Sequence, residues 1–212
     1  MCGFVVSNKS GVVREALIRQ RHRGPDAVSM WKGQGLEMGH VLLDINGSKT
    51  IQPYTTKKGN VLVFNGEMYN CPIENDTAWL GEGMDRYGIR FLEYNNWHGA
   101  VAYLDIEKNE LLVTRDHFGA KPLWFQMLSP TEWLFSTSLR SMVHKKVDEK
   151  HKPSFLFNPI WHGTSCPYQN TWKVAPGQTF KFDLNNPGER VHKNIWDYYR
   201  IESRRFKTAR VR

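Results

Sequence analysis

The sequence predicts an α+β fold in which antiparallel sheets stack beneath outer layers of helix. Long apolar stretches typical of buried strands recur along the chain, and short polar or glycine-rich turns join neighbouring stretches into hairpins. Helical segments, chiefly residues 12–20 and a segment that ends near Tyr87, alternate with these strands. Because each element must bury one apolar face, we expect packed layers around a common core.

The first elements are a short buried strand at 3–7 and a helix at 12–20. The helix is predicted because four residues recur at helical spacing: Val13, Ala16, Leu17 and Gln20. Gly24 and Pro25 then interrupt the helical pattern and indicate an exposed loop at 21–26.

The following elements are mostly strands. Strands at 28–32 and 36–43 flank Gly33-Gln34-Gly35, which is typical of a tight hairpin loop. A strongly apolar strand at 60–64 is expected to present Asn65 at its end. The later expected elements are a short helix within 88–96, strands at 100–104, 111–113, 123–127 and 133–136, a short helix at 138–144 and a strand at 179–184.

Length and composition indicate one domain with a tail. The chain has 212 residues, of which 40% are apolar, enough for one core. We place the domain at 1–197, with an irregular insert near 144–172, and a basic tail at 198–212. The tail holds six Lys and Arg residues against one Glu, five of the eight net positive charges. Such a tail can contact nucleic acid or an acidic partner, or remain a solvated chain end.

The same sequence argues against a metal site, a bound cofactor and a membrane-spanning segment. The three cysteines, Cys2, Cys71 and Cys166, are widely spaced and form neither a disulfide framework nor a zinc signature. The glycines near residue 35 lack the spacing of a dinucleotide-binding loop. No apolar run is long enough to cross a bilayer, and the start lacks the features of a secretion signal. We therefore expect a cytoplasmic protein without a bound cofactor.

Cys2 is the candidate nucleophile. A small residue after the initiator permits removal of Met1, which would leave the Cys2 thiol beside a free α-amine. The usual pKa of an α-amine, about 7.7–8, suits a general base. A buried and inert cysteine is the alternative reading when Cys2 is taken alone.

Three downstream motifs favour a nucleophilic Cys2 over an inert one: Arg21-His22-Arg23-Gly24-Pro25-Asp26, Phe64-Asn65-Gly66-Glu67-Met68-Tyr69-Asn70 and Arg115-Asp116-His117-Phe118-Gly119-Ala120-Lys121-Pro122-Leu123. With Cys2, their order and separations resemble the glutaminase domain of class II glutamine amidotransferases, most closely that of glutamine-hydrolysing asparagine synthetase. The resemblance runs from Cys2 to about Val143. It implies a four-layer αββα sandwich of the N-terminal-nucleophile hydrolase type.

Asn65 and Gly66 are the predicted oxyanion hole. Attack of a thiolate on an amide creates an oxyanion, which an Asn side-chain amide and the next backbone N–H can stabilise. An isolated Asn-Gly pair would instead favour a turn. The resemblance also implies that Arg23, Ile45, Glu67 and Asp76 surround the substrate, with Asp76 on its α-ammonium group. Asp76 can also cap the helix that follows it, and both roles can hold at once.

One departure from the family pattern concerns the α-carboxylate of the substrate. The family has an arginine two residues after a histidine, and here His40 is followed by Leu42. Loss of one partner of a desolvated ion pair costs about 2–5 kcal/mol. Three explanations remain open: Arg23 or Lys49 replaces the arginine, the substrate is not free glutamine, or the site is degenerate.

The Arg115 to Leu123 motif is expected to do structural work. Gly119 and Pro122 shape a turn between strands, and we expect Arg115 and Asp116 to hold it. His117 is interpreted as a structural or surface histidine rather than as a base.

The sequence therefore predicts a stand-alone glutaminase that releases ammonia for a separate synthetase or other acceptor enzyme, since the chain ends before any synthetase motif. Two alternatives are a hydrolase of another γ-glutamyl amide and a catalytically inactive subunit that binds a partner. A third is a nucleic-acid binder that acts through the basic tail.

Overall fold

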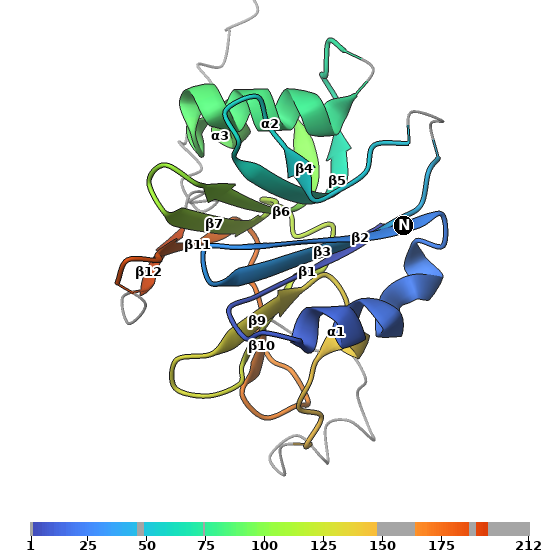
Figure 1. Ribbon diagram of the computed structural model, residues 1–212, viewed down its shortest axis with the longest axis vertical. Helices are drawn as coiled ribbons and strands as arrows, with labels where there is room; N and C mark the ends of the chain where they lie inside the picture. Colours follow the sequence, from blue (N-terminus) through green and yellow to red (C-terminus); the bar gives the residue numbers. More distant parts are fainter. Residues whose placement is uncertain (1, 46–48, 74, 148–163, 187–189, 195–212) are drawn as a thin grey trace, which may run out of the picture.

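The computed structural model describes residues 2–45, 49–73, 75–147, 164–186 and 190–194. Four layers are stacked in Figure 1. Helices α2 (Asp76–Tyr87) and α3 (Arg90–Tyr94) form the first, two six-stranded sheets form the second and third, and α1 (Val12–Gln20) forms the fourth. This αββα sandwich is the predicted fold class.

Sheet A carries the first strand of the chain at its centre. Its strand order is β10-β8-β9-β1-β3-β2, with every neighbouring pair antiparallel. The strands are β1 (Gly3–Ser7), β2 (Ala27–Gly33), β3 (Leu36–Leu42), β8 (Trp124–Met127), β9 (Trp133–Ser136) and β10 (Thr171–Lys173). Helix α1 covers the outer face of this sheet and buries the four residues that the helical spacing predicts.

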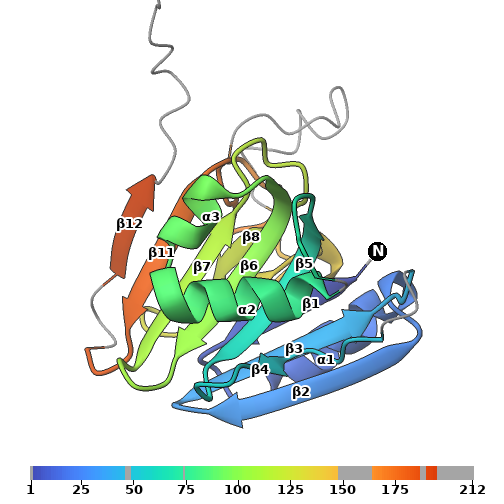
Figure 2. The same cartoon turned by 90° about the horizontal axis from the view of Figure 1, so that it is seen from above.

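Sheet B has the order β12-β11-β7-β6-β5-β4 and is also entirely antiparallel. Its strands are β4 (Tyr54–Thr55), β5 (Val61–Met68), β6 (Trp97–Asp105), β7 (Glu110–Arg115), β11 (Gln178–Asp183) and β12 (Arg190–Asn194). Figure 2 shows α2 lying across the outer face of this sheet. Leu80 and Met84 of α2 pack there against Leu62 and Phe64.

The main core lies between the two sheets. Side chains alternate between the two faces of a strand, so Phe4 and Val6 of β1 point into this core while Val5 points toward α1. By the same rule, Val61 and Val63 of β5 face inward from sheet B. This alternation also determines which side chains further along the same strands reach the functional site.

The predicted end of the strand at 60–64 was wrong. The strand was expected at 60–64, whereas β5 continues to Met68 and includes Asn65 and Gly66. The ladder with β6 continues because Gly66 lies opposite Gly99, and neither residue has a side chain to separate the backbones. Asn65 is therefore held within a sheet rather than on a loop after it.

Two further boundaries differ from expectation. Only a short 3₁₀ turn, Leu139–Ser141, forms where a helix was predicted at 138–144. The side-chain oxygen Oε1 of Gln126 accepts the N–H groups of Val143 and His144, at 2.9 and 3.1 Å, and so removes them from any continuing helix. Strand β10, inside the region expected to be irregular, forms through pairing with β8.

The predicted basic tail at 198–212 and residues 148–163 of the predicted insert lie outside the described residues. Within the described part of the chain, no helix combines the length and apolar character that a membrane crossing requires.

Candidate active site

Cys2 lies where β1 begins, at one end of the core between the sheets. A backbone N–H, that of Leu43 just after β3, donates to its sulfur at an N···S distance of 3.4 Å, and the thiol lies 3.6 Å from the Leu43 carbonyl oxygen. The main chain just after β3 thus contacts the thiol through both its N–H and its carbonyl oxygen.

Arg23 lies beside this cysteine. Its Nε donates to the Cys2 carbonyl oxygen at 3.2 Å. Burial lowers the pKa of Arg23, and the nearby Cys2 acts in the opposite direction. The residue that follows Arg23 packs closely on β3, because a Cβ at Gly24 would lie 2.5 Å from the backbone of Val41. The structure thus places Arg23 against the main chain of the candidate nucleophile, outside the cavity lining.

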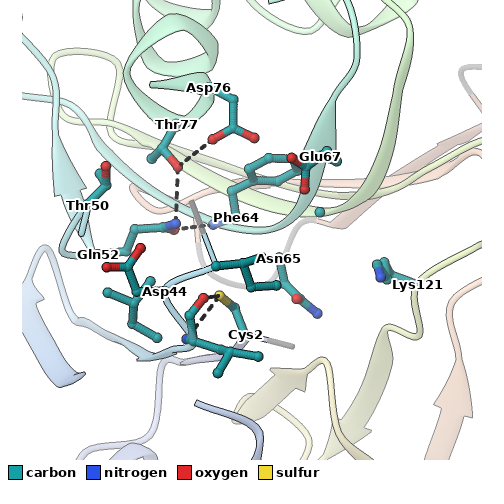
Figure 3. A pocket seen from close by; sticks show the side chains of 14 residues that line it. Cys2, Asp44, Thr50, Gln52, Phe64, Asn65, Glu67, Asp76, Thr77 and Lys121 are labelled. Atoms are coloured by element: carbon teal, nitrogen blue, oxygen red, sulfur yellow. Dashed lines mark hydrogen bonds between the residues drawn. The ribbon is translucent and has the colours of Figure 1, made fainter. Parts of the chain in front are cut away.

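A cavity of about 270 Å³ opens in front of Cys2 (Figure 3). It is lined by six of the seven site residues that sequence reasoning selected: Cys2, Ile45, Asn65, Gly66, Glu67 and Asp76. Their gathering follows from strand alternation. Asn65 continues the inward-facing row of Val61 and Val63, and Leu42 continues that of Leu36 and Met38.

Asn65 supplies a hydrogen-bond donor without a protein partner. The side chain is almost fully buried, with 2% of its surface exposed. Its Nδ2 forms no hydrogen bond to any residue that the structure describes. Buried polar atoms are nearly always hydrogen-bonded, so a group of this kind calls for a functional explanation.

Gly66 supplies a second donor. The N–H groups of alternate residues in a strand point to the same edge, and the N–H of Phe64 donates to Oε1 of Gln52 at 2.6 Å. The N–H of Gly66 therefore points to the edge of β5 where Gln52 and the cavity lie. Only glycine fits here, because a Cβ would lie 2.1 Å from the His98 carbonyl oxygen.

Gln52 is a site residue that sequence reasoning did not select. Besides accepting from Phe64, it donates from Nε2 to the Thr77 hydroxyl at 3.2 Å, and its carbonyl oxygen accepts from the Ser29 hydroxyl. It therefore joins β2, β5 and α2 at the cavity wall. Its place in an irregular stretch before Pro53 offered no periodic signal that could have identified it.

Asp76 faces the cavity from the start of α2. Asn75 caps the helix, since its Oδ1 accepts from the Ala78 N–H at 3.0 Å. The Asp76 carboxylate accepts from the Thr77 hydroxyl at 3.4 Å and also lines the cavity. Burial raises the pKa of Asp76, while backbone N–H groups of Met68 and Thr77 act in the opposite direction. A desolvated carboxylate of this kind is suited to a cationic partner.

The cavity wall is rich in negative charge. Carboxylates of Asp44, Glu67 and Asp76 line it, and Lys121 is the one Lys or Arg among its described lining residues. Leu42 presents an apolar side chain. Lys49, a sequence-based candidate for the missing cation, is exposed and lies outside the lining.

The turn before Lys121 is held as predicted. Arg115 donates to three carbonyl oxygens, those of Gly119, Lys121 and Val174, at 2.5 to 2.7 Å. The Asp116 carboxylate accepts four backbone N–H groups, from Gly99, Phe118, Ala120 and Lys121. The structural role expected for this pair is confirmed. His117 does not line the cavity.

The described residues offer no metal site: they contain no group of three or more His, Cys, Asp or Glu side chains arranged to bind a metal ion. The three cysteines are unpaired.

Comparison with known proteins identifies the fold and the family. A family model described as a glutamine amidotransferase domain matches residues 1–193. Solved structures with this fold include the glutamine phosphoribosylpyrophosphate amidotransferase of B. subtilis, with a TM-score of 0.61 and 12% identity, covering 92% of this chain and 49% of that one.

Curated relatives are similar in sequence over part of their length. Amidase chry2 of Gibberella zeae is 24% identical over 197 residues, which cover 83% of this chain and 29% of that protein. Asparagine synthetase B [glutamine-hydrolyzing] of Escherichia coli is 32% identical over 126 residues, 49% of this chain and 22% of that protein. Asparagine synthetase domain-containing protein 1 of Mus musculus is 28% identical, over 70% of this chain and 27% of that protein. The chain thus spans less than a third of the length of these relatives.

Proposed function

Because this chain belongs to the glutamine amidotransferase domain family, we propose that it hydrolyses a glutamine side-chain amide through the thiol of Cys2. The observation that carries the proposal is the buried Nδ2 of Asn65, which has no hydrogen-bond partner among the described residues and lies in the same cavity as that thiol. A fixed donor without a ground-state partner suits an oxyanion that exists only during the reaction.

The proposed reaction begins after removal of Met1, which lies outside the described residues. The α-amine of Cys2 takes the thiol proton, and the thiolate attacks the amide carbon. Nδ2 of Asn65 and the N–H of Gly66 stabilise the resulting oxyanion. The amine then gives its proton to the leaving nitrogen, and ammonia departs as the thioester forms. Water attacks the thioester and yields glutamate and free thiol.

The remaining site residues position this chemistry. The Leu43 N–H and Arg23 hold Cys2 through its sulfur and carbonyl oxygen. Asp76 binds the α-ammonium group of the substrate, since its carboxylate is half-buried and faces the cavity. Ile45 and Glu67 line the substrate side of the cavity.

We also propose that the ammonia serves a separate acceptor enzyme in a reducing, cytoplasmic setting. The names of two curated relatives, which are glutamine-hydrolysing asparagine synthetases, support the use of ammonia in synthesis. The thiol nucleophile and the two other free cysteines suit a reducing compartment. Transfer of amide ¹⁵N from glutamine to a co-purifying acceptor would test this part.

The first test is intact-mass analysis followed by ammonia and glutamate release on the same sample. We expect loss of Met1, turnover by the wild-type protein and none by Cys2→Ala. Processed, folded protein that releases no ammonia from any glutamine compound would reject the enzymatic proposal and favour a partner-binding subunit.

A further inference from the structure

We propose that the cavity prefers a glutamine residue whose α-amine is free and whose α-carboxyl is already bound in an amide, such as the N-terminal glutamine of a peptide. This inference rests on the proposed hydrolysis at Cys2 and specifies the substrate class of the same site.

The charge of the cavity supports this preference. Three carboxylates, those of Asp44, Glu67 and Asp76, line it against the single ammonium group of Lys121 among the described lining residues. Free glutamine is a zwitterion, so its carboxylate would enter a region of mostly negative charge. A glutamine with a capped carboxyl carries only the positive charge. The cavity attracts the second molecule more strongly because like charges repel at short range.

Beside Cys2, the described residues 42–45 and Thr50 that line the cavity include no Lys or Arg. Leu42 is an apolar side chain that lines the cavity and is 7% exposed. Arg23 lies outside the cavity lining, and its Nε donates to the Cys2 carbonyl oxygen. A carboxylate that loses water without gaining a cation is strongly disfavoured, whereas a neutral amide needs only hydrogen bonds.

A hydrogen-bonding group for that amide lies on the same wall. Thr50 lines the cavity, and its hydroxyl oxygen accepts from Nδ2 of Asn75 at 2.7 Å. The hydroxyl hydrogen can therefore be donated elsewhere, and an amide carbonyl of the substrate is a suitable acceptor.

Lys121 is the cation in the described cavity lining that could pair with the carboxylate of free glutamine. In Figure 3 it lies on the far side of Asn65 from Asp44 and Thr50. It belongs to the turn that Arg115 and Asp116 hold rigidly. We therefore place Lys121 away from the wall that would receive the α-carboxyl group, and the experiment tests that placement directly.

The experiment compares ammonia release from L-glutamine, L-glutaminamide, the dipeptide Gln-Gly and N-acetylglutamine by processed full-length protein. We expect kcat/KM for glutaminamide and Gln-Gly to exceed that for glutamine at least about tenfold, because only glutamine brings an unpaired carboxylate. N-acetylglutamine, which lacks the ammonium group, should be the poorest substrate.

Two variants test whether the wall at Leu42 determines the substrate preference. Leu42→Arg introduces a cation and should raise kcat/KM for glutamine while lowering the preference for the capped compounds. Lys121→Met should change that preference far less than Leu42→Arg does, because the Lys121 side chain lies away from that wall. If Leu42→Arg does not fold, the wild-type substrate ratio and the Lys121→Met protein still decide the question.

The outcomes separate this inference from the proposed function. The inference is overturned, with the hydrolase intact, if the enzyme turns over glutamine as efficiently as the capped compounds. It is also overturned if Lys121→Met selectively loses glutamine turnover by about tenfold or more, because Lys121 would then be the partner of the substrate carboxylate. No ammonia from any of the four compounds would reject the hydrolase, and the inference with it.

Discussion

Replacement of Asn65 by alanine tests the oxyanion hole directly. Removal of one oxyanion donor costs about 2.7–4 kcal/mol of transition-state stabilisation, or about 10²- to 10³-fold in kcat. Because Nδ2 has no hydrogen-bond partner within the described structure, Asn65→Ala breaks no protein hydrogen bond made by that donor. We therefore expect kcat to fall by this factor with little change in KM or in the free energy of unfolding.

The assay pairs steady-state ammonia release with denaturant unfolding of the same preparations. Asn60 provides a matched control, because it is buried in the same sheet region but outside the cavity. Its Nδ2 donates to Asp85 and Tyr103, and its Oδ1 accepts from the Ile106 N–H. Asn60→Ala should lower the free energy of unfolding by about 1–3 kcal/mol, since it leaves buried groups unpaired. Turnover by its folded fraction should stay near that of wild type.

Asn65 is not an oxyanion donor if Asn65→Ala retains kcat within about threefold of wild type. The assignment is also contradicted if Asn65→Ala lowers the free energy of unfolding as much as Asn60→Ala does. Asn65 would then be a structural side chain.

Three further predictions concern the surroundings of the site. Gly66→Ala should reduce kcat/KM at least about tenfold and destabilise the fold by about 1–3 kcal/mol, since its Cβ would clash with the His98 carbonyl; kinetics and unfolding measure both effects. Gln52→Leu should cost about 1–3 kcal/mol in unfolding free energy by leaving the Phe64 N–H unpaired, and it should lower kcat by loosening β5. Burial lowers the pKa of His40 to about 4, so the unfolded chain binds its proton first as pH falls. Stability should therefore decrease by about 2 kcal/mol between pH 7 and pH 5, and the decrease should be absent in His40→Gln when urea unfolding is compared at the two pH values.

Each of these predictions has a contradicting result. Wild-type kinetics in Gly66→Ala would show that β5 can move away from β6. Unchanged kcat in Gln52→Leu would show that its hydrogen bonds do not position the oxyanion donors. An equal loss of stability at pH 5 in wild type and His40→Gln would assign the pH effect to other groups.

Much of the fold could be predicted because local chemistry determines it. The helical spacing in 12–20 and the glycine loop after Gly33 depend on residues close together in the chain, and both predictions are confirmed. The predicted strand end at 64 and helix at 138–144 were wrong for a shared reason. A distant partner, β6 in the first case and Gln126 in the second, determines where those backbone hydrogen bonds go.

For the site, the sequence by itself determined the reactive groups: a cysteine at position 2, an Asn-Gly pair after an apolar run, and an aspartate at the start of a helix. These assignments depend on residue type and on spacing along the chain. Only the tertiary structure decided that Gln52 joins three elements at the cavity wall, that Arg23 contacts the Cys2 carbonyl, and that carboxylates outnumber cations around the cavity. Those properties arise where two sheets meet, because burial and charge balance depend on side chains that are far apart in the sequence.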